Sequence, residues 1–210
     1  MIKLDEREKM IVAQSKGKSV VHIGCADWPY TARRFEEGRL LHDRISEVAT
    51  KVIGVDLDNE RLAPLRDRFP DQTFLTIEEF ANSELDVDVV IAGEVIEHVP
   101  DPGEFLRSIR SSIVKGSELF LTTPNAQSIK SAMRGLVGKE YQHPDHVVLF
   151  STATMTKILT ETGWKAKHFD YYWATPSTFT GKVSAGMFKV LGAVSSKRSA
   201  DGLVVSAISQ

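Results

Sequence analysis

The sequence predicts an α/β protein built on a doubly wound, mostly parallel sheet of about seven strands. Short apolar, β-branched runs recur along the chain, and longer segments with helical patterning lie between them. Parallel strands have this pattern because helices cover both faces of their sheet. Right-handed crossovers between such strands bring ligands to the carboxyl ends of the strands, so polar residues at those ends are the first candidates for function.

Seven runs are expected as strands. They are SVVHIG (19–24), KVIGVD (51–56), QTFLT (72–76), VDVVIAG (87–93), ELFLTT (118–123), KAKHFDYYW (165–173) and DGLVVSAIS (201–209). The first five alternate with helical segments as successive βαβ units, which is typical of a Rossmann-like sheet.

Six segments show helical patterning. The first three have Pro or Asp near their starts, and the third ends at Gly116. No repeat, low-complexity tract or linker divides the chain, so residues 1–210 are interpreted as one domain. The expected helices cover 31–48, 59–69, 102–114, 125–137, 152–162 and about 177–194.

The composition excludes several protein classes. The 210 residues are 42 % hydrophobic and 26 % charged with a net charge of −2, which are ordinary globular proportions. Because the chain lacks the basic surplus with which nucleic-acid binders neutralise phosphates, no nucleic-acid partner is expected. The lone Cys25 has no partner for an internal disulfide and no apolar run is long enough to span a bilayer, so a cytoplasmic protein is expected.

The turn after the first strand, HIGCADW (22–28), is a candidate cofactor contact. Gly24 allows the backbone to approach a ligand closely. A dinucleotide would need the later glycines of GxGxxG, whereas Asp27 repels phosphate and Trp28 is bulky. A cofactor with an ammonium and a sulfonium group would instead be attracted by Asp27 and an aromatic neighbour. The alternative is that Gly24 forms only a tight turn.

Two carboxylates follow one another at the end of the second strand. Asp56 is expected to accept hydrogen bonds from the hydroxyls of a ribose. Asp58 is expected to cap the helix that starts at Asn59. The alternative is that either acid serves only as a cap.

The richest pattern follows the fourth strand, in GEVIEHVPDP (93–102). Carboxylates and a histidine at the carboxyl end of a strand belong at the mouth of a ligand site. With this pattern, the sequence resembles class I S-adenosylmethionine-dependent methyltransferases, especially the ubiquinone-biosynthesis O-methyltransferase group. VVHIGCADW resembles the glycine-rich first motif, with Ala26 and Trp28 in place of two glycines, and VIGVDLD resembles the acidic second motif. The likeness covers about residues 18–173, and DGLVVSAIS resembles the antiparallel last strand of the family.

The resemblance implies a set of residues that bind S-adenosyl-L-methionine. His22 stands where the first motif has its first acid. The implied residues are His22, Gly24, Cys25 and Ala26 at the methionyl part, Asp56 and Leu57 at the ribose and adenine, Ile77 and Glu78 beside the adenine, and Gly93 and Glu94 on the sulfonium side.

The resemblance also raises the question of a metal ion. In some ubiquinone-type relatives the pattern Glu-x-x-Glu-His holds a divalent ion, and Glu94, Glu97 and His98 match it. Carboxylates with an imidazole suit Mg, Mn or Zn. The alternative is that Glu97 and His98 only hydrogen-bond the loop.

Three histidines are candidate bases for a hydroxyl acceptor, because neutral imidazole accepts protons near neutral pH. His146 is the first choice, followed by His98 and by His143, which shares the polar loop of His146. The alternative is that residues 144–146 form a turn that satisfies backbone groups. His42 and His168 have no comparable neighbours in the sequence and are expected as surface or edge residues.

Two amphipathic segments, about 125–146 and 177–198, are expected on the substrate side. Their apolar stripes suit packing in a core or a homodimer, and equally a peripheral membrane contact or a cover over an apolar substrate. The expected function is methyl transfer from S-adenosylmethionine to an oxygen of a small-molecule, glycan or lipid-linked acceptor. The alternative is a non-catalytic cofactor-binding or regulatory subunit with a degenerate site. A nicotinamide-dependent oxidoreductase is disfavoured by Asp27 and Trp28.

Overall fold

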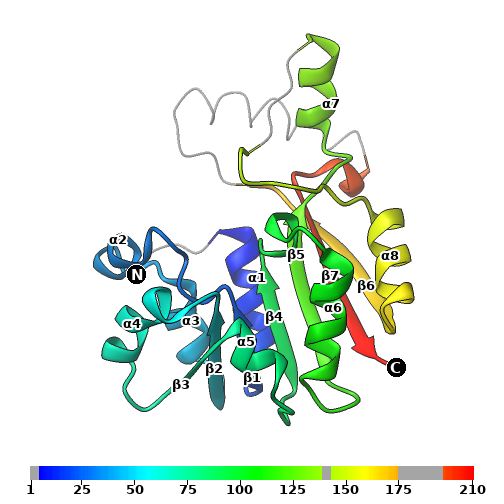
Figure 1. The fold of residues 1–210 in the computed structure, drawn as a ribbon. Coiled ribbons are helices and arrows are strands. Elements are labelled where there is room, and N and C mark those ends of the chain that lie inside the picture. Colours follow the sequence, from blue (N-terminus) through cyan, green and yellow to red (C-terminus); the bar gives the residue numbers. More distant parts are fainter. Residues whose placement is uncertain (1–4, 139–142, 175–195) are drawn as a thin grey trace.

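The computed structural model describes residues 5–138, 143–174 and 196–210, and its centre is one seven-stranded sheet (Figure 1). The strand order is β3-β2-β1-β4-β5-β7-β6. All seven expected strands form, which confirms the predicted fold class. The strands are β1 (Ser19–Ile23), β2 (Lys51–Asp56), β3 (Thr73–Thr76), β4 (Val89–Gly93), β5 (Glu118–Pro124), β6 (Trp164–Tyr172) and β7 (Gly202–Ser209).

The first five strands pair in parallel, and β7 runs antiparallel to both of its neighbours, β5 and β6. From β1 the chain builds outward to β2 and β3, and it then returns to the other side of β1 to add β4 and β5. The carboxyl ends of β1 and β4 therefore flank the topological switch point, where doubly wound sheets bind their ligands. The antiparallel last strand is confirmed.

Helices cover both faces of the sheet, and each face has its own core. On one face, Ile11 of α1 and Ile45 of α3 pack on the sheet with Val20 and Ile91. On the other face, helices α5, α6 and α8 supply Phe80, Leu106 and Leu159, among others. The helices are α1 (Glu6–Ser15), α2 (Thr31–Glu36), α3 (Leu41–Ser46), α4 (Asn59–Arg68), α5 (Ile77–Ala81), α6 (Pro102–Ser111), α7 (Ile129–Leu136) and α8 (Thr152–Glu161), with 3-10 turns η1 (Ile96–His98) and η2 (Lys197–Ser199).

The expected single helix over 31–48 is wrong, since the structure has two short helices, α2 and α3. Gly38 lies between them with a φ of +59°, a left-handed conformation that interrupts a right-handed helix. The expected helix over about 177–194 lies outside the described residues.

Helices α1 and α5 were not expected, although each begins with a reciprocal capping box. In α1, Asp5 and Glu8 each bind the other's backbone N–H at 2.8 Å. In α5, Thr76 and Glu79 do the same. These pairs three residues apart are a sequence signal for helix starts, and both were available to sequence reasoning. Among the described residues, no helix is long and apolar enough to cross a membrane.

Candidate cofactor and acceptor site

The turn after β1 is built around a left-handed glycine. Gly24 has a φ of +76°, and a Cβ on it would lie 2.8 Å from Cγ2 of Val95. The N–H groups of Gly24 and Cys25 both donate to the carbonyl of Val55, at 2.8 and 3.2 Å, so the turn is tied to β2. Both the conformation and the lack of space therefore require glycine at this position.

Asp56 fastens the end of β2 to the same turn. Its Oδ2 accepts from the N–H of Ala26 at 2.9 Å, and its Oδ1 accepts from the N–H of Leu57 at 2.8 Å. The side chain is buried, yet a carboxylate has about four acceptor sites in total, so these two bonds leave it able to accept others. Asp58 accepts from the N–H of Arg61 at 3.0 Å and caps α4, which confirms the cap expected for Asp58.

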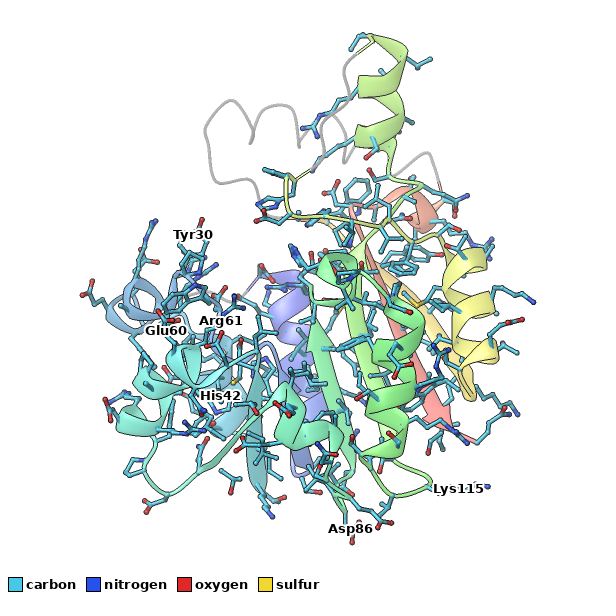
Figure 2. All side chains as sticks on the ribbon, viewed as in Figure 1. Tyr30, His42, Glu60, Arg61, Asp86 and Lys115 are labelled. Atoms are coloured by element: carbon cyan, nitrogen blue, oxygen red, sulfur yellow. The ribbon has the colours of Figure 1, made fainter. Side chains whose placement is uncertain are left out.

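The rim of the turn carries a charged pair and exposed aromatic side chains. Asp27 adopts a left-handed φ of +52° and lies 2.9 Å from Nε of Arg34. Burial raises the pKa of the Asp27 carboxyl, and Arg34 opposes this rise. Trp28 and Tyr30 follow Asp27 and are exposed, and Tyr30 lies at the outer edge of this part of the molecule in Figure 2.

The remaining expected adenine contacts lie next to Asp56. Leu57 is 55 % exposed. Thr76 pairs with Asp56 across β2 and β3, so Ile77 and Glu78 at the start of α5 follow directly at the same sheet edge. Apolar side chains therefore lie beside Asp56, the residue proposed to bind the ribose.

His22 belongs to a buried histidine pair. Its Nδ1 lies 3.2 Å from Nδ1 of His42, and the two rings stack with 5.4 Å between centroids. Nε2 of His42 lies 2.8 Å from Oε1 of Gln72, an acceptor, so His42 carries its proton there and accepts from His22 at Nδ1. Burial lowers the pKa of His42 to about 4, and burial, His42 and Arg7 lower the pKa of His22 well below its ordinary value.

The expectation that His42 is a surface or edge residue is wrong, because its side chain is fully buried. Its ring lies against Phe69 and Phe74, with 5.3 Å between centroids in each case. The sequence offered little sign of this pairing, since residues 20 apart meet only through packing of α3 on β1. The same expectation is confirmed for His168, which is exposed on the edge strand β6.

At the end of β4, Glu94 is held by residues from two other strands. Its Oε1 accepts from the hydroxyl of Tyr172 at 2.7 Å and from that of Thr122 at 3.2 Å. Arg7 of α1 lies beside it, with Nη1 3.7 Å from where a Cβ on Gly93 would stand. Burial lowers the pKa of the Arg7 guanidinium. Glu94, Tyr172, Asp5 and Glu8 together raise it by more, so the pKa is raised overall. Sequence reasoning missed Arg7 and Tyr172, which no local pattern marks.

Glu97 is a fully buried carboxyl group. Its Oε2 accepts from the hydroxyl of Thr123 at 3.1 Å, while its Oε1 has no hydrogen-bond partner in the described part of the chain. Burial raises the pKa of Glu97, and the nearby Glu94 raises it further. An unpartnered buried oxygen is costly, so this atom is a natural contact for a ligand or an ion.

The three candidate bases form one cluster. The ring centroid of His146 lies 4.8 Å from that of His98 and 5.1 Å from that of His143. Nδ1 of His98 lies 3.0 Å from the carbonyl oxygen of Asp145, so Nδ1–H donates a hydrogen bond to it and Nε2 is left as an acceptor. Burial lowers the pKa of His146, and the neighbouring His98 and His143 add to the effect, so its neutral form is favoured.

The same cluster contains a possible set of metal ligands. Glu97, His98 and His146 each place one ligand atom within 4.8 Å of the others. The third residue of this set is His146 and not Glu94, which the sequence predicted. Oε1 of Glu94 is engaged by Tyr172 and Thr122. Two imidazoles and one carboxylate, one oxygen of which has no partner among the described residues, fit a divalent transition metal better than Mg.

The sequence and the fold are both similar to those of known proteins. A family model described as a methyltransferase domain matches residues 4–168. The structure superposes on an S-adenosylmethionine-dependent methyltransferase from Archaeoglobus fulgidus with a TM-score of 0.55 at 18 % identity, covering 96 % of this chain and 94 % of that one. It also superposes on magnesium protoporphyrin IX methyltransferase from Synechocystis with bound S-adenosylhomocysteine, with a TM-score of 0.59 at 16 % identity, covering 97 % and 82 %. The chain therefore belongs to the methyltransferase-domain family, and the expected class is confirmed.

Within that family, the sequence is similar to ubiquinone biosynthesis O-methyltransferases. The protein of Idiomarina loihiensis is 30 % identical over 132 residues, which are 60 % of this chain and 49 % of that protein. That of Hahella chejuensis is 30 % identical over 145 residues, or 66 % and 54 %. The chain thus spans about half the length of the curated relatives that it matches.

Proposed function

We propose that this protein transfers the methyl group of S-adenosylmethionine to an oxygen of a small-molecule, glycan or lipid-linked acceptor in the cytoplasm. The observation that carries the proposal is the position of the histidine cluster: His98 lies on η1 shortly after β4, and the loop of His143 and His146 is held against it by the N–H of Val147, which donates to the carbonyl of Glu97 at 2.8 Å. A cofactor turn and a set of proton acceptors thus share the carboxyl edge of the sheet. The similarity to O-methyltransferases supports oxygen as the methylated atom.

In the proposed binding mode, the charges of the site match those of the cofactor. Asp56 would accept from the ribose hydroxyls with the sites that its two backbone bonds leave open. Arg7 would hold the carboxylate of the methionyl part, and Glu94 would face a positive group of the cofactor. Leu57 and Ile77 would cover the adenine. His22, buried against His42, would support the turn from beneath.

In the proposed reaction, the sulfonium supplies an electrophilic methyl group, so the chain has mainly to align the acceptor and exclude water. His146 would take the hydroxyl proton as the oxygen–carbon bond forms and the carbon–sulfur bond breaks. His98 would be a second proton acceptor, since its Nδ1 donates to the carbonyl of Asp145 and its Nε2 can accept. The products are the methyl ether, S-adenosylhomocysteine and a protonated imidazole.

The test of the cofactor site compares two neighbouring acids. We expect Asp56→Ala to weaken binding of S-adenosylmethionine by at least about 100-fold, because charge-assisted hydrogen bonds to both ribose hydroxyls are lost. The control Asp58→Ala removes a helix cap and a partly exposed ion pair with Arg61 at 3.6 Å, so it should cost about 1 kcal/mol of stability and leave affinity nearly unchanged. Isothermal titration calorimetry measures both. Equal affinity of Asp56→Ala and wild type would remove the ribose role.

A second candidate function is a cofactor-binding or regulatory subunit without catalysis. Ala26 and Trp28, which stand where the related motif has glycines, are the observation in its favour. Calorimetry with S-adenosylmethionine, followed by transfer of a tritiated methyl group to pooled catechols, phenols and glycosides, separates the two. Tight binding without any transfer would favour the subunit over the enzyme.

A divalent metal bound by Glu97, His98 and His146 is the competing arrangement, because a histidine that ligates an ion has no lone pair left to take the hydroxyl proton; the donor set suits Zn or Mn. A bound ion would orient the acceptor hydroxyl and favour its ionisation. Titration of the protein with zinc and with manganese, each repeated on His146→Ala, tests this directly. Binding that persists in the variant would place the ion elsewhere.

The acceptor side has an apolar surface that supports a lipid-linked acceptor or a peripheral membrane contact. Helix α7 has no buried residue and rises beyond the sheet at the top of Figure 1. Exposed apolar residues here are Met133 and Leu136 of α7, Val137 directly after it, and Val147 on the loop that carries His146. A homodimer that covers α7 is the competing arrangement, and analytical ultracentrifugation with and without lipid vesicles distinguishes them.

A further inference from the structure

Tyr172 reaches the site from the edge strand of the sheet. It is the last residue of β6, and β7 and β5 lie between β6 and β4 (Figure 1). Its hydroxyl nevertheless lies 2.7 Å from Oε1 of Glu94, the residue that follows β4. The side chain therefore crosses the neighbouring strands to touch the proposed cofactor site.

Gly202 provides the path for this side chain. It pairs directly with Tyr172 across β6 and β7, and a Cβ on Gly202 would overlap the aromatic ring of Tyr172. Any other residue at this position would push the ring off the strand. The absence of a side chain on β7 thus allows a contact between β6 and the end of β4.

The contact holds one oxygen of Glu94 and leaves the other. Tyr172 and Thr122 both donate to Oε1, and among the hydrogen bonds of the described residues none is made to Oε2. The N–H of Glu94 donates to the carbonyl of Thr122 at 2.9 Å, which fixes the left-handed backbone of Glu94, with its φ of +56°. Backbone and side chain are therefore both fixed before a ligand arrives, which is the form of preorganisation that strengthens binding.

Tyr172 is well suited to act as a constant donor. It is buried, and burial together with Glu94 raises the pKa of its hydroxyl well above the ordinary value, so the proton stays on the oxygen. Arg7 supplies positive charge beside the pair, while Glu97 is the other acid that faces it. The hydrogen bond from Tyr172 is thus available throughout the neutral pH range.

We propose that Tyr172 is a positioning residue that directs Oε2 of Glu94 towards a positive group of S-adenosylmethionine. This inference rests on the proposed function, because it needs the cofactor in the turn beside Glu94. The positive group is either the sulfonium or the α-ammonium, and both would be attracted by a fixed carboxylate. Only S-adenosylmethionine carries the sulfonium, whereas S-adenosylhomocysteine keeps the ammonium and has a neutral sulfur.

The test uses Tyr172→Phe with Tyr171→Phe as its matched control. Tyr171 precedes it on the same strand and also loses one hydrogen bond, to the hydroxyl of Thr152 at 2.7 Å, on the side away from Glu94. We expect Tyr172→Phe to weaken binding of S-adenosylmethionine about tenfold, which is typical for loss of a hydrogen bond to a charged group. Tyr171→Phe should stay within about twofold of wild type.

Calorimetry with both ligands identifies the positive group. An equal loss for S-adenosylmethionine and S-adenosylhomocysteine assigns the ammonium, and a loss for S-adenosylmethionine alone assigns the sulfonium. In a Glu94→Gln background, Tyr172→Phe should cause less than about a twofold further loss, because the two residues act as one unit. A purely structural role would instead lower the melting temperature without changing affinity.

Two results would overturn the inference in different ways. If wild type binds S-adenosylmethionine and Tyr172→Phe binds it equally well, the positioning role is wrong and the proposed function stands. If wild type binds neither ligand, the proposed function itself fails and the inference fails with it.

Discussion

Two histidine clusters lie in this molecule, and they differ in almost every physical respect. The side chains of His22 and His42 are both buried. Nδ1 of His22 contacts Nδ1 of His42, and Nε2 of His42 contacts Gln72. The cluster of His98, His143 and His146 is at the surface or partly exposed, and Nε2 of His98 is left as an acceptor. The same side chain is therefore a neutral packing element in one place and a candidate base in the other.

The difference shows what burial does to an imidazole. In the buried pair, the cost of removing a charge from water keeps both rings neutral down to acidic pH. In the open cluster, burial together with His98 and His143 lowers the pKa of His146, and this partly exposed ring stays in its neutral form, which can accept a proton from a ligand. Proton transfer needs a group that can change its charge, which the buried pair cannot do at low cost.

The largest effect is expected from His146→Ala. Loss of a positioned base should slow methyl transfer by about 100- to 10,000-fold and leave the affinity for S-adenosylmethionine unchanged. The measurement is tritiated-methyl transfer to the best acceptor among pooled catechols, phenols and glycosides. His143→Ala is the control and should cost less than about threefold. Turnover at the wild-type rate in His146→Ala would assign the proton to another group.

Removal of a ring from the buried pair should affect stability instead. His42→Ala leaves a cavity beside Phe69 and Phe74 and removes the partner of Gln72, which together should cost about 4 kcal/mol of the free energy of unfolding. Urea denaturation measures this. His168→Ala, on the exposed edge strand, should stay within about 0.5 kcal/mol of wild type. A similar small loss for His42→Ala would mean that the pair is not a packing element.

The pH dependence of stability is a finer test of the same contrast. His42 has a pKa of about 4 when folded and an ordinary value of 6.5 when unfolded, so the unfolded state binds more protons between these limits. Stability should therefore fall as the pH is lowered from about 6.5 to about 4, by roughly 3 kcal/mol for this residue. The difference in slope between wild type and His42→Gln isolates the contribution from that of the carboxylates. Identical slopes would contradict the depressed pKa.

The sequence alone was sufficient for the parts of the molecule that depend on local pattern. The apolar runs located the strands, and Asp58 could be predicted as a helix cap because it directly precedes the helical segment that starts at Asn59. Helices α1 and α5 were missed although Asp5–Glu8 and Thr76–Glu79 carry recognisable capping boxes. Those two errors came from an overlooked signal, not from missing information.

Other features could not be predicted, because they arise from contacts between distant segments. Arg7 meets Glu94 only because α1 packs behind the sheet, and Tyr172 reaches it only because Gly202 has no side chain. The burial of His42 depends on how α3 lies over β1. Each case joins residues whose separation along the chain carries no periodic signal, so packing had to be seen before function could be assigned.

The place of β7 in the sheet has a consequence for synthesis on the ribosome. Residues 202–209 are made after all the other strands, yet they lie between β5 and β6 and pair with both. Until this segment has emerged, β6 has no neighbour to pair with, and Tyr172 has no strand to cross. The nascent chain can therefore complete the first five strands early, whereas Glu94 gains its tyrosine partner only after residues 202–209 have been made.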